Sequence, residues 1–490
     1  MRNIFAIFIT TFVELSFSQH NPHFFPNRTG IVHLFEWKFK DIARECETYL
    51  SPNGFGGVQV SPINENAIVF KRPWFERYQP ISYRIITRSG DENDFRNMVT
   101  KCNTVGVRVY VDIVVNHMAA GNGQVNGTGG GTAFIPDKSY PNVPYNETHF
   151  HETCAINDYN NAVEVRNCEL VGLPDLDQSL EYVRARIVNF MNKLIDFGVA
   201  GFRMDAAKHM WPNDLSVIYN RLNNLSNYFA TGSRPFIYQE VIDLGGEAVK
   251  KTEYISLGAV TEFKFSLEIS RAFRGHNELK WLKSWGVKWG LLPSKYSLVF
   301  VDNHDNQRNG AGGSEILTYK FPKMYVMAVA FMLAHPYGTP RIMSSFFFDF
   351  IDQGPPANVS TEEIISPKIL SNGTCTNGWV CEHRWTEIVG MIGFRNRVRG
   401  EAIANWWDND NNAIAFCRGN KGFVVFNNEP DDLQLTFNTC LSRGNYCDVI
   451  SGRKSGNICT GQQISVNEKG KSVIRIKAQS VVAVHSGAKI

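Results

Sequence analysis

The sequence lacks the features that mark membrane, nucleic-acid-binding and zinc proteins. Beyond the N-terminal segment, no apolar run is long enough to span a bilayer. Net charge is only +3 over 490 residues and no basic run occurs, so nothing indicates a nucleic acid partner. The ten cysteines lack the CxxC-like spacing with clustered histidines that a zinc site needs. Repeats and low-complexity linkers are also missing. These absences favour a globular protein, with no membrane partner, that acts on a neutral substrate.

The N-terminus has the pattern of an export signal. Arg2 precedes an apolar stretch over residues 4–17, and the small residues Ser16 and Ser18 stand before a cut at Gln19. The alternative is a first buried helix of the fold, which the basic flank and the absence of a helical period disfavour. We therefore predict a signal peptide over residues 1–18 and a secreted, extracellular protein.

Cysteine usage agrees with export. The number of cysteines is even, and Cys375 and Cys381 lie close together in the sequence, as do Cys447 and Cys459. Close pairs among Gly, Asn and Ser are typical of disulfide-closed surface loops in an oxidising compartment. Six Asn-x-Ser/Thr sites permit glycosylation: Asn27, Asn126, Asn146, Asn224, Asn358 and Asn372.

Eight short apolar runs have the spacing of strands in a barrel. Helix-like segments such as residues 92–103 and 181–197 separate most of them. This alternation predicts a (β/α)8 barrel, because the rival doubly wound sheet rarely needs eight strands. The expected strands are 31–35, 56–61, 107–115, 199–204, 236–240, 259–265, 298–302 and 339–344.

Two parts of the chain do not fit the barrel repeat. Between Asn116 and Asp205 the chain is far longer than the roughly 30 residues of one repeat. The excess predicts a small, irregular inserted domain over residues 116–176, after the third strand, bonded by Cys154 and Cys168. After about Gly400, short alternating runs separated by turns predict an antiparallel β-sandwich over residues 401–490. The barrel then comprises residues 19–115 and 177–400.

Three acidic residues fall at the predicted C-terminal ends of strands, where barrels of this kind carry reactive groups. Asp205 ends the fourth strand, Glu240 the fifth and Asp305 the seventh, so all three face one cleft. Two carboxyl groups about 5–5.5 Å apart hydrolyse glycosides with retention of configuration. For any one of these acids taken alone, a purely structural ion pair with a nearby Arg or Lys stays an open alternative. That alternative is a weak explanation for three acids at matching strand ends.

Four ordered segments at these strand ends resemble the motifs of the α-amylase family, most closely those of the animal enzymes. They are residues 112–117, 201–209, 239–243 and 301–305. The similarity extends over nearly all of the chain after residue 18. It implies an extracellular, monomeric enzyme that cuts internal α-1,4 bonds of starch, glycogen and maltooligosaccharides.

The resemblance also implies residue roles. Asp205 corresponds to the nucleophile, kept ionised by Arg203, Glu240 to the general acid/base, and Asp305 to the residue that stabilises the distorted sugar. Seven further residues correspond to substrate-binding positions: Trp74, Tyr78, Gln79, His117, Lys208, His209 and His304.

Calcium is implied where the inserted domain meets the barrel. The corresponding ligands are Asn116, Asp175 and the backbone carbonyls of Arg166 and His209, which are the oxygen donors this ion prefers. Pro174 stands where the family has an apolar residue and should stiffen the loop. For Asp175 alone, a helix N-cap is the competing interpretation.

Chloride is implied by a second arginine. Arg203, Asn303 and Arg341 correspond to the residues that hold the anion in chloride-dependent members. We expect chloride to keep Arg341 from pairing with Glu240. The alternative is that Arg341 only forms a salt bridge inside the barrel.

The sequence departs from the family in the cleft. Phe75 replaces a second Trp, and the loop over residues 310–313 is one residue shorter and lacks the family's histidine, with Asn309 near that place. Preference for long glucans therefore stays open.

Four cysteine pairs correspond to family disulfides: Cys46–Cys102, Cys154–Cys168, Cys375–Cys381 and Cys447–Cys459. Two cysteines are left over, Cys417 and Cys440, and we predict that they pair with each other.

Three rival functions remain. An α-glucosidase or transglycosylase would share the acids but carry a different insert and tail. A non-catalytic barrel relative would lack an acid and carry a membrane span. A glucan-binding protein could reach starch through the sandwich, where Trp406 and Trp407 are the only adjacent aromatic pair of interest.

Overall fold

A computed structural model describes residues 19–490, and the predicted signal peptide lies outside this described part. Eight parallel strands close into a barrel in which β1 pairs with both β2 and β13. The prediction of a (β/α)8 barrel is confirmed. Its strands are β1 (Thr29–Leu34), β2 (Phe55–Val60), β6 (Arg108–Ile113), β9 (Gly201–Met204), β10 (Phe236–Gln239), β11 (Ala259–Thr261), β12 (Ser297–Val299) and β13 (Thr339–Ser344).

Helices surround the barrel and bury their apolar faces against it. They are α1 (Phe39–Glu45), α2 (Glu92–Thr104), α4 (Glu181–Phe197), α5 (Pro212–Asn220), α6 (Phe263–Phe273), α7 (Pro322–Ala334) and α8 (Thr386–Arg397). Three expected strands, residues 107–115, 259–265 and 298–302, ran past the observed ends of β6, β11 and β12. The side chain of Glu262 accepts a hydrogen bond from the backbone N–H of Lys264, which caps α6 and ends β11 at Thr261.

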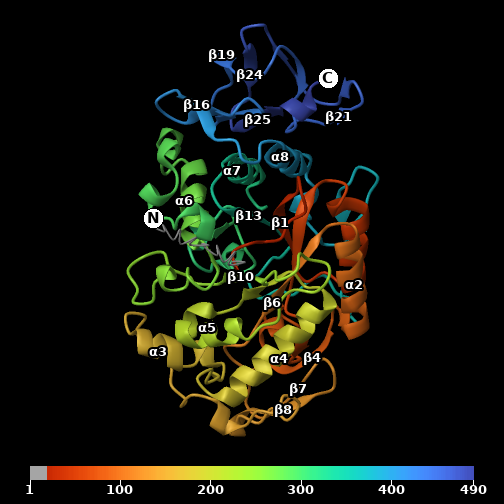
Figure 1. Cartoon of the computed structure of the whole chain (residues 1–490), viewed down its shortest axis with the longest axis vertical. Coiled ribbons are helices and arrows are strands. Elements are labelled where there is room, and N and C mark those ends of the chain that lie inside the picture. The colour runs from red at the N-terminus through yellow and green to blue at the C-terminus, as the bar shows by residue number, and fades with distance from the viewer. Residues whose placement is uncertain (1–18) are drawn as a thin grey trace, which may run out of the picture.

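The inserted segment has little regular structure, as expected. It contains the short hairpin of β7 (Gln124–Asn126) and β8 (Thr132–Phe134) and the helix α3 (Ala162–Asn167). Figure 1 shows these elements at one end of the molecule. Buried Glu65 anchors the insert, because its carboxylate accepts backbone N–H groups of Gly129 at 3.0 Å and Gly131 at 2.6 Å. This contact places the insert beside the mouth of the barrel.

The C-terminal strands form an all-β unit at the opposite end of the molecule (Figure 1). One four-stranded sheet has the order β16-β17-β18-β25, and β19 pairs with β24 and β20 with β23. A separate apolar cluster forms its core, and α7 and α8 contact β25. The bounds are β16 (Ile403–Asp408), β17 (Ala413–Arg418), β18 (Gly422–Asn427), β19 (Leu433–Asn438), β20 (Gly444–Cys447), β23 (Gln463–Val466), β24 (Lys471–Ile476) and β25 (Ser480–His485).

All ten cysteines form disulfides. The four pairs that the family resemblance implies are present, and Cys417 pairs with Cys440 as predicted.

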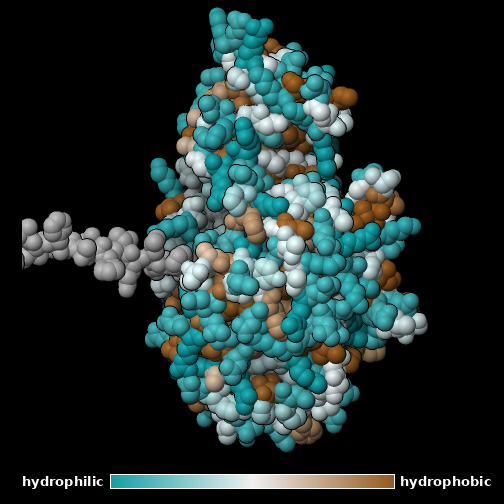
Figure 2. Space-filling model, turned by 45° about the vertical axis from the view of Figure 1, so that its right-hand side comes forward, coloured by the Kyte–Doolittle hydropathy of each residue, from teal (hydrophilic) through white to brown (hydrophobic). Residues whose placement is uncertain are grey.

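All six asparagines of the Asn-x-Ser/Thr sites are exposed. On the face in Figure 2, hydrophobic residues lie in small groups among hydrophilic ones. Within residues 19–490 no helix is both long enough and apolar enough to cross a membrane.

Candidate active site

A cavity of about 700 Å³ opens at the C-terminal ends of the barrel strands. Asp205 directly follows β9, Glu240 directly follows β10, and Asp305 lies in the loop after β12. All three line the cavity, as their strand positions predicted. Six of the seven predicted substrate-binding residues line it too: Trp74, Tyr78, Gln79, His117, Lys208 and His209.

Arg203 on β9 joins the carboxyl groups. Its Nη1 contacts Asp205 at 2.8 Å and Asp112 at 2.6 Å, and its Nη2 contacts Glu240 at 2.6 Å. Strand register brings these groups together, because Arg203 lies opposite Asp112 of β6 and opposite Tyr238 of β10. One fully buried guanidinium therefore fixes Asp205 and Glu240 side by side.

Several carboxyl groups of this cluster have raised pKa values. Burial raises the pKa of Asp205 well above its ordinary value, and Arg203 opposes that rise. Burial and the nearby Glu240 raise the pKa of Asp305 to about 7. Burial also raises the pKa of Asp112, again opposed by Arg203. Because the groups interact, the proton belongs to the cluster rather than to one residue.

His304 takes a different place from the other predicted sugar ligands. It is 1% exposed and stacks on Tyr78, with ring centroids 5.0 Å apart, and its Nε2 lies 3.3 Å from Asp305. It therefore lies behind the cavity wall. His117 does line the cavity, and burial lowers its pKa to about 4, so it stays neutral.

Two residues of the site were missed by the sequence reasoning. Asp112 anchors Arg203 and accepts a hydrogen bond from the Tyr78 hydroxyl at 3.0 Å. A carboxylate inside a fully buried strand needs a partner, and that signal could have revealed it. Tyr159 reaches the cavity from the insert, where Lys208 lies 4.9 Å from its ring. No sequence pattern marks Tyr159.

Phe75, Gly310 and Ala311, the positions of departure from the family, also line the cavity. The smaller aromatic ring and the shorter loop therefore affect the surface that a substrate would contact.

The predicted chloride residues lie deeper in the barrel. Arg341 is 1% exposed and donates to Gln59 at 2.8 Å, so among the described residues it pairs with neither Glu240 nor another carboxylate. The partner of Glu240 is Arg203 instead. Arg341 Nη2 and Arg203 Nε are buried and have no hydrogen-bond acceptor in the described structure. Two unsatisfied cationic N–H groups fit a bound anion.

Asn303 lies at the start of the loop that carries Asp305. Its Oδ1 accepts the backbone N–H of Asp305 at 3.1 Å, and its Nδ2 is 3.5 Å from the Asp305 carboxylate. Asn303 thus shapes this loop, and its weakly engaged amide N–H leaves a donor for an anion.

The predicted calcium ligands meet where the insert joins the barrel. The Leu176 N–H donates to the Asn116 carbonyl at 2.9 Å, and His209 Nδ1 lies 2.8 Å from the carbonyl oxygen of Val165, the neighbour of Arg166. Oδ1 of Asn116 and Oδ1 of Asp175 are buried without a hydrogen-bond partner in the described part of the chain. Burial raises the pKa of Asp175 to about 7. Unsatisfied buried oxygens of this kind fit a hard cation.

Among residues 19–490, no group of three or more His, Cys, Asp or Glu side chains could hold a metal. The predicted calcium site does not require such a group of side chains. It has a single carboxylate, and its other donors are an amide and two backbone carbonyls.

Comparison with known proteins identifies the family. The family described as Alpha amylase, catalytic domain, matches residues 47–343. The chain belongs to the α-amylase family. The family described as Alpha amylase, C-terminal all-beta domain, matches residues 404–487.

Relatives of this α-amylase family member cover it nearly end to end. The "Alpha-amylase-related protein" of Drosophila melanogaster is 55% identical over 97% of both chains, and that of Drosophila willistoni is 53% identical over 100% of both. The structure of wild-type alpha-amylase I from Eisenia fetida is 45% identical, with a TM-score of 0.90, over 94% of this chain and 98% of that one. A mutant of that earthworm enzyme was solved as a maltohexaose complex and is 44% identical, also with a TM-score of 0.90 and the same coverage.

Proposed function

We propose that the protein is an exported α-amylase that cuts internal α-1,4 bonds of starch and glycogen with retention of configuration. The observation that carries this proposal is the placement of Asp205 and Glu240 on one buried guanidinium at the cavity wall. Two carboxyl groups held by the terminal nitrogens of one guanidinium are consistent with the close pair of acids that retaining glycosidases use.

The two acids divide the chemistry. The Asp205 carboxylate attacks the anomeric carbon while Glu240 gives its proton to the leaving glycosidic oxygen, which produces a glycosyl-enzyme ester. Glu240 then takes a proton from water, the water attacks the anomeric carbon, and Asp205 leaves. The first step requires Glu240 to be protonated and Asp205 to be ionised.

The surrounding residues orient these groups. The backbone N–H of Ala206 donates to Glu240 Oε2 at 2.9 Å, and Arg203 holds its Oε1, so both carboxyl oxygens have fixed positions. Asp305 stabilises the distorted sugar, and Trp74 and Tyr78 present aromatic faces to the substrate. His304 fixes Tyr78 and Asp305 from behind the wall.

Two ions complete the proposal. Asn116, Asp175 and the carbonyls of Arg166 and His209 would hold calcium, which supplies a rigid link between insert and barrel. A second set, Arg203, Asn303 and Arg341, would hold chloride, which supplies a negative charge beside two buried arginines.

The rival functions fit less well. Trp406 stacks flat on Phe416 and Trp407 packs edge-on against Phe437, so both indoles pack within the β-sheet unit rather than forming a starch-binding platform. All three acids lie in the cavity, unlike in a non-catalytic relative. The C-terminal match favours an α-amylase over an α-glucosidase.

The test is a product profile on starch and on end-blocked maltooligosaccharides, with the anomeric form followed by NMR. We expect internal cleavage, α-anomeric products, and loss of nearly all turnover in Glu240→Gln. Glu468→Gln, an exposed change in the C-terminal unit, is the matched control and should keep wild-type turnover. Release of glucose from chain ends alone, or substantial turnover by Glu240→Gln, would refute the proposal.

A further inference from the structure

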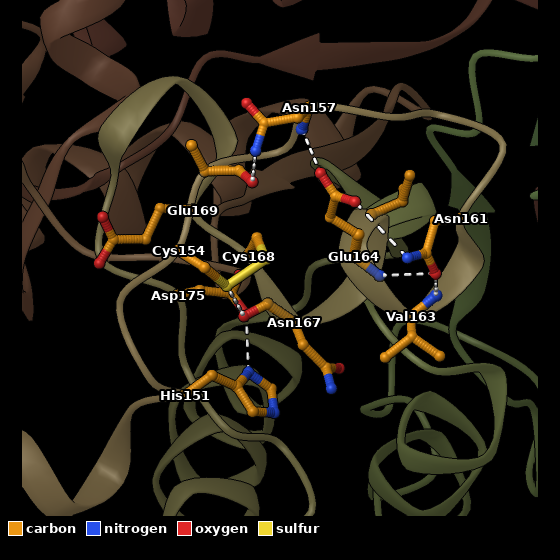
Figure 3. Close-up of a disulfide and its surroundings, with 12 residues drawn as sticks. His151, Cys154, Asn157, Asn161, Val163, Glu164, Asn167, Cys168, Glu169 and Asp175 are labelled. Carbon is orange, nitrogen blue, oxygen red and sulfur yellow. Dashed lines mark hydrogen bonds and ion pairs between the residues drawn. A yellow bond between two sulfur atoms is a disulfide. The ribbon is translucent and has the colours of Figure 1, made fainter.

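His151, a residue of the insert, contacts the predicted calcium ligand Asp175. Its Nδ1 lies 2.7 Å from Asp175 Oδ2, and Figure 3 shows the imidazole directed at this carboxyl group. Asp175 itself is 1% exposed. One carboxyl oxygen is thereby occupied, while Oδ1 stays buried without a partner in the described structure. The two oxygens of this carboxyl group therefore have different surroundings.

A second unsatisfied oxygen belongs to Asn116, the other predicted side-chain ligand. The backbone of Asn116 contacts the residue that follows Asp175, because the Leu176 N–H donates to the Asn116 carbonyl at 2.9 Å. Asn116 Oδ1 is also buried without a hydrogen-bond partner in the region described. Two buried acceptors without partners are unfavourable unless a cation or a water molecule satisfies them.

His151 is itself held firmly. Its backbone N–H donates to the Asp175 carbonyl at 3.0 Å, and its Nε2 lies 3.5 Å from Asp177. Three residues along the chain, the Cys154–Cys168 disulfide ties this segment to the end of α3. Beside it the Glu169 N–H donates to the Cys154 carbonyl at 2.8 Å. Figure 3 shows the disulfide next to the His151–Asp175 pair.

The disulfide therefore connects two parts of one site. On one side it fixes His151, which orients Asp175. On the other side it fixes the end of α3, which carries the predicted carbonyl ligand Arg166 two residues before Cys168.

We propose that His151 is a positioning residue for the calcium site: its Nδ1–H holds the Asp175 carboxylate in the orientation that presents Oδ1 to the ion. This inference rests on the proposed calcium site. Outer hydrogen-bond partners of metal ligands fix ligand geometry, and their loss typically costs 10–100-fold in metal affinity.

The test uses isosteres that keep one ring nitrogen or the other. In His151→Asn the amide nitrogen takes the place of Nδ1, and in His151→Gln it takes the place of Nε2. We expect His151→Asn to bind calcium within about threefold of wild type, and His151→Gln and His151→Ala to bind about 10–100-fold more weakly. Glu152→Ala, an exposed change one residue on, is the matched control and should bind as wild type does.

Calcium affinity is measured on the metal-stripped full-length chain by competition with a chromophoric chelator, and the Tm is recorded without calcium. A merely structural role for His151 would lower the metal-free Tm of His151→Gln and leave its affinity intact, and that result would overturn the inference. Equal affinities of His151→Asn and His151→Gln would overturn it as well. If the wild-type chain bound no calcium, the proposed site would fail and this inference with it.

Discussion

Replacing Arg203 by lysine tests the arrangement on which the proposed catalysis depends. Arg203 makes three short ionic contacts, to Asp112 at 2.6 Å, to Asp205 at 2.8 Å and to Glu240 at 2.6 Å. A lysine ammonium is a point charge on a flexible stem and keeps at most one of them in good geometry. Two charge-assisted hydrogen bonds are then lost, at about 1.5–3 kcal/mol each.

Losing two such hydrogen bonds removes about 3–6 kcal/mol of interaction energy. These bonds hold Asp205 and Glu240, the groups that must be fixed in the transition state. If all of this energy is lost there, kcat/KM falls by about 10²–10⁴, since each 1.36 kcal/mol is a factor of ten. The assay is kcat/KM on an end-blocked maltooligosaccharide, with near-UV circular dichroism to show that Arg203→Lys is folded.

Arg84→Lys is the control for that experiment. Arg84 also makes a bidentate contact with a buried carboxylate, that of Glu65, but its side chain is 47% exposed and lies away from the cavity. It should retain wild-type kcat/KM. If Arg203→Lys kept more than a tenth of wild-type activity, Arg203 would not be the group that holds the two acids together.

Two further predictions follow from other buried groups. Arg341→Gln should abolish any dependence of activity on chloride, because one of two unsatisfied cationic groups is removed. A chloride titration of initial rates measures this dependence. An unchanged dependence would rule out Arg341 as an anion ligand. Glu65→Gln should lower the Tm and expose the Gly131 amide to hydrogen exchange. Burial raises the pKa of Glu65, but hydrogen bonds from Ser82 and Arg84 outweigh this and lower it overall. Stability from Glu65 is therefore fully present above its ordinary pKa of about 4.3 and is lost as the pH falls through the lower folded value. The Tm difference between wild type and Glu65→Gln should shrink on acidification, and a difference that grew would contradict this reasoning.

Strand positions could be predicted from the sequence because barrel strands are short, apolar and regularly spaced. For the same reason Asp205, Glu240 and Asp305 could be placed on one rim before any coordinates were known. The boundary of β11 was wrong, because an apolar run does not distinguish the end of a strand from the start of a buried helix. Only the Glu262 cap separates the two.

Side-chain partners were the part that the sequence could not predict. We expected Arg341 to be the arginine that competes for Glu240, but the register between β9 and β10 puts Arg203 there and leaves Arg341 with Gln59. Likewise His151 is separated from Asp175 by the Cys154–Cys168 loop, and only the folded insert brings them together. Contacts across a barrel or an irregular loop depend on three-dimensional register that no local pattern encodes.

The proton of the acid/base step is best understood as a property of the whole cluster. Four carboxyl groups surround Arg203, which lies 3.9 Å from Asp305 and closer to the other three. One guanidinium cannot balance three buried carboxylates and the partly exposed Asp305, and burial raises the pKa of Asp112, Asp205 and Asp305. Arg341 does not correct this deficit by direct contact, since it donates to Gln59. Burial is therefore the main cause of the raised pKa values in this cluster, and Arg203 opposes it.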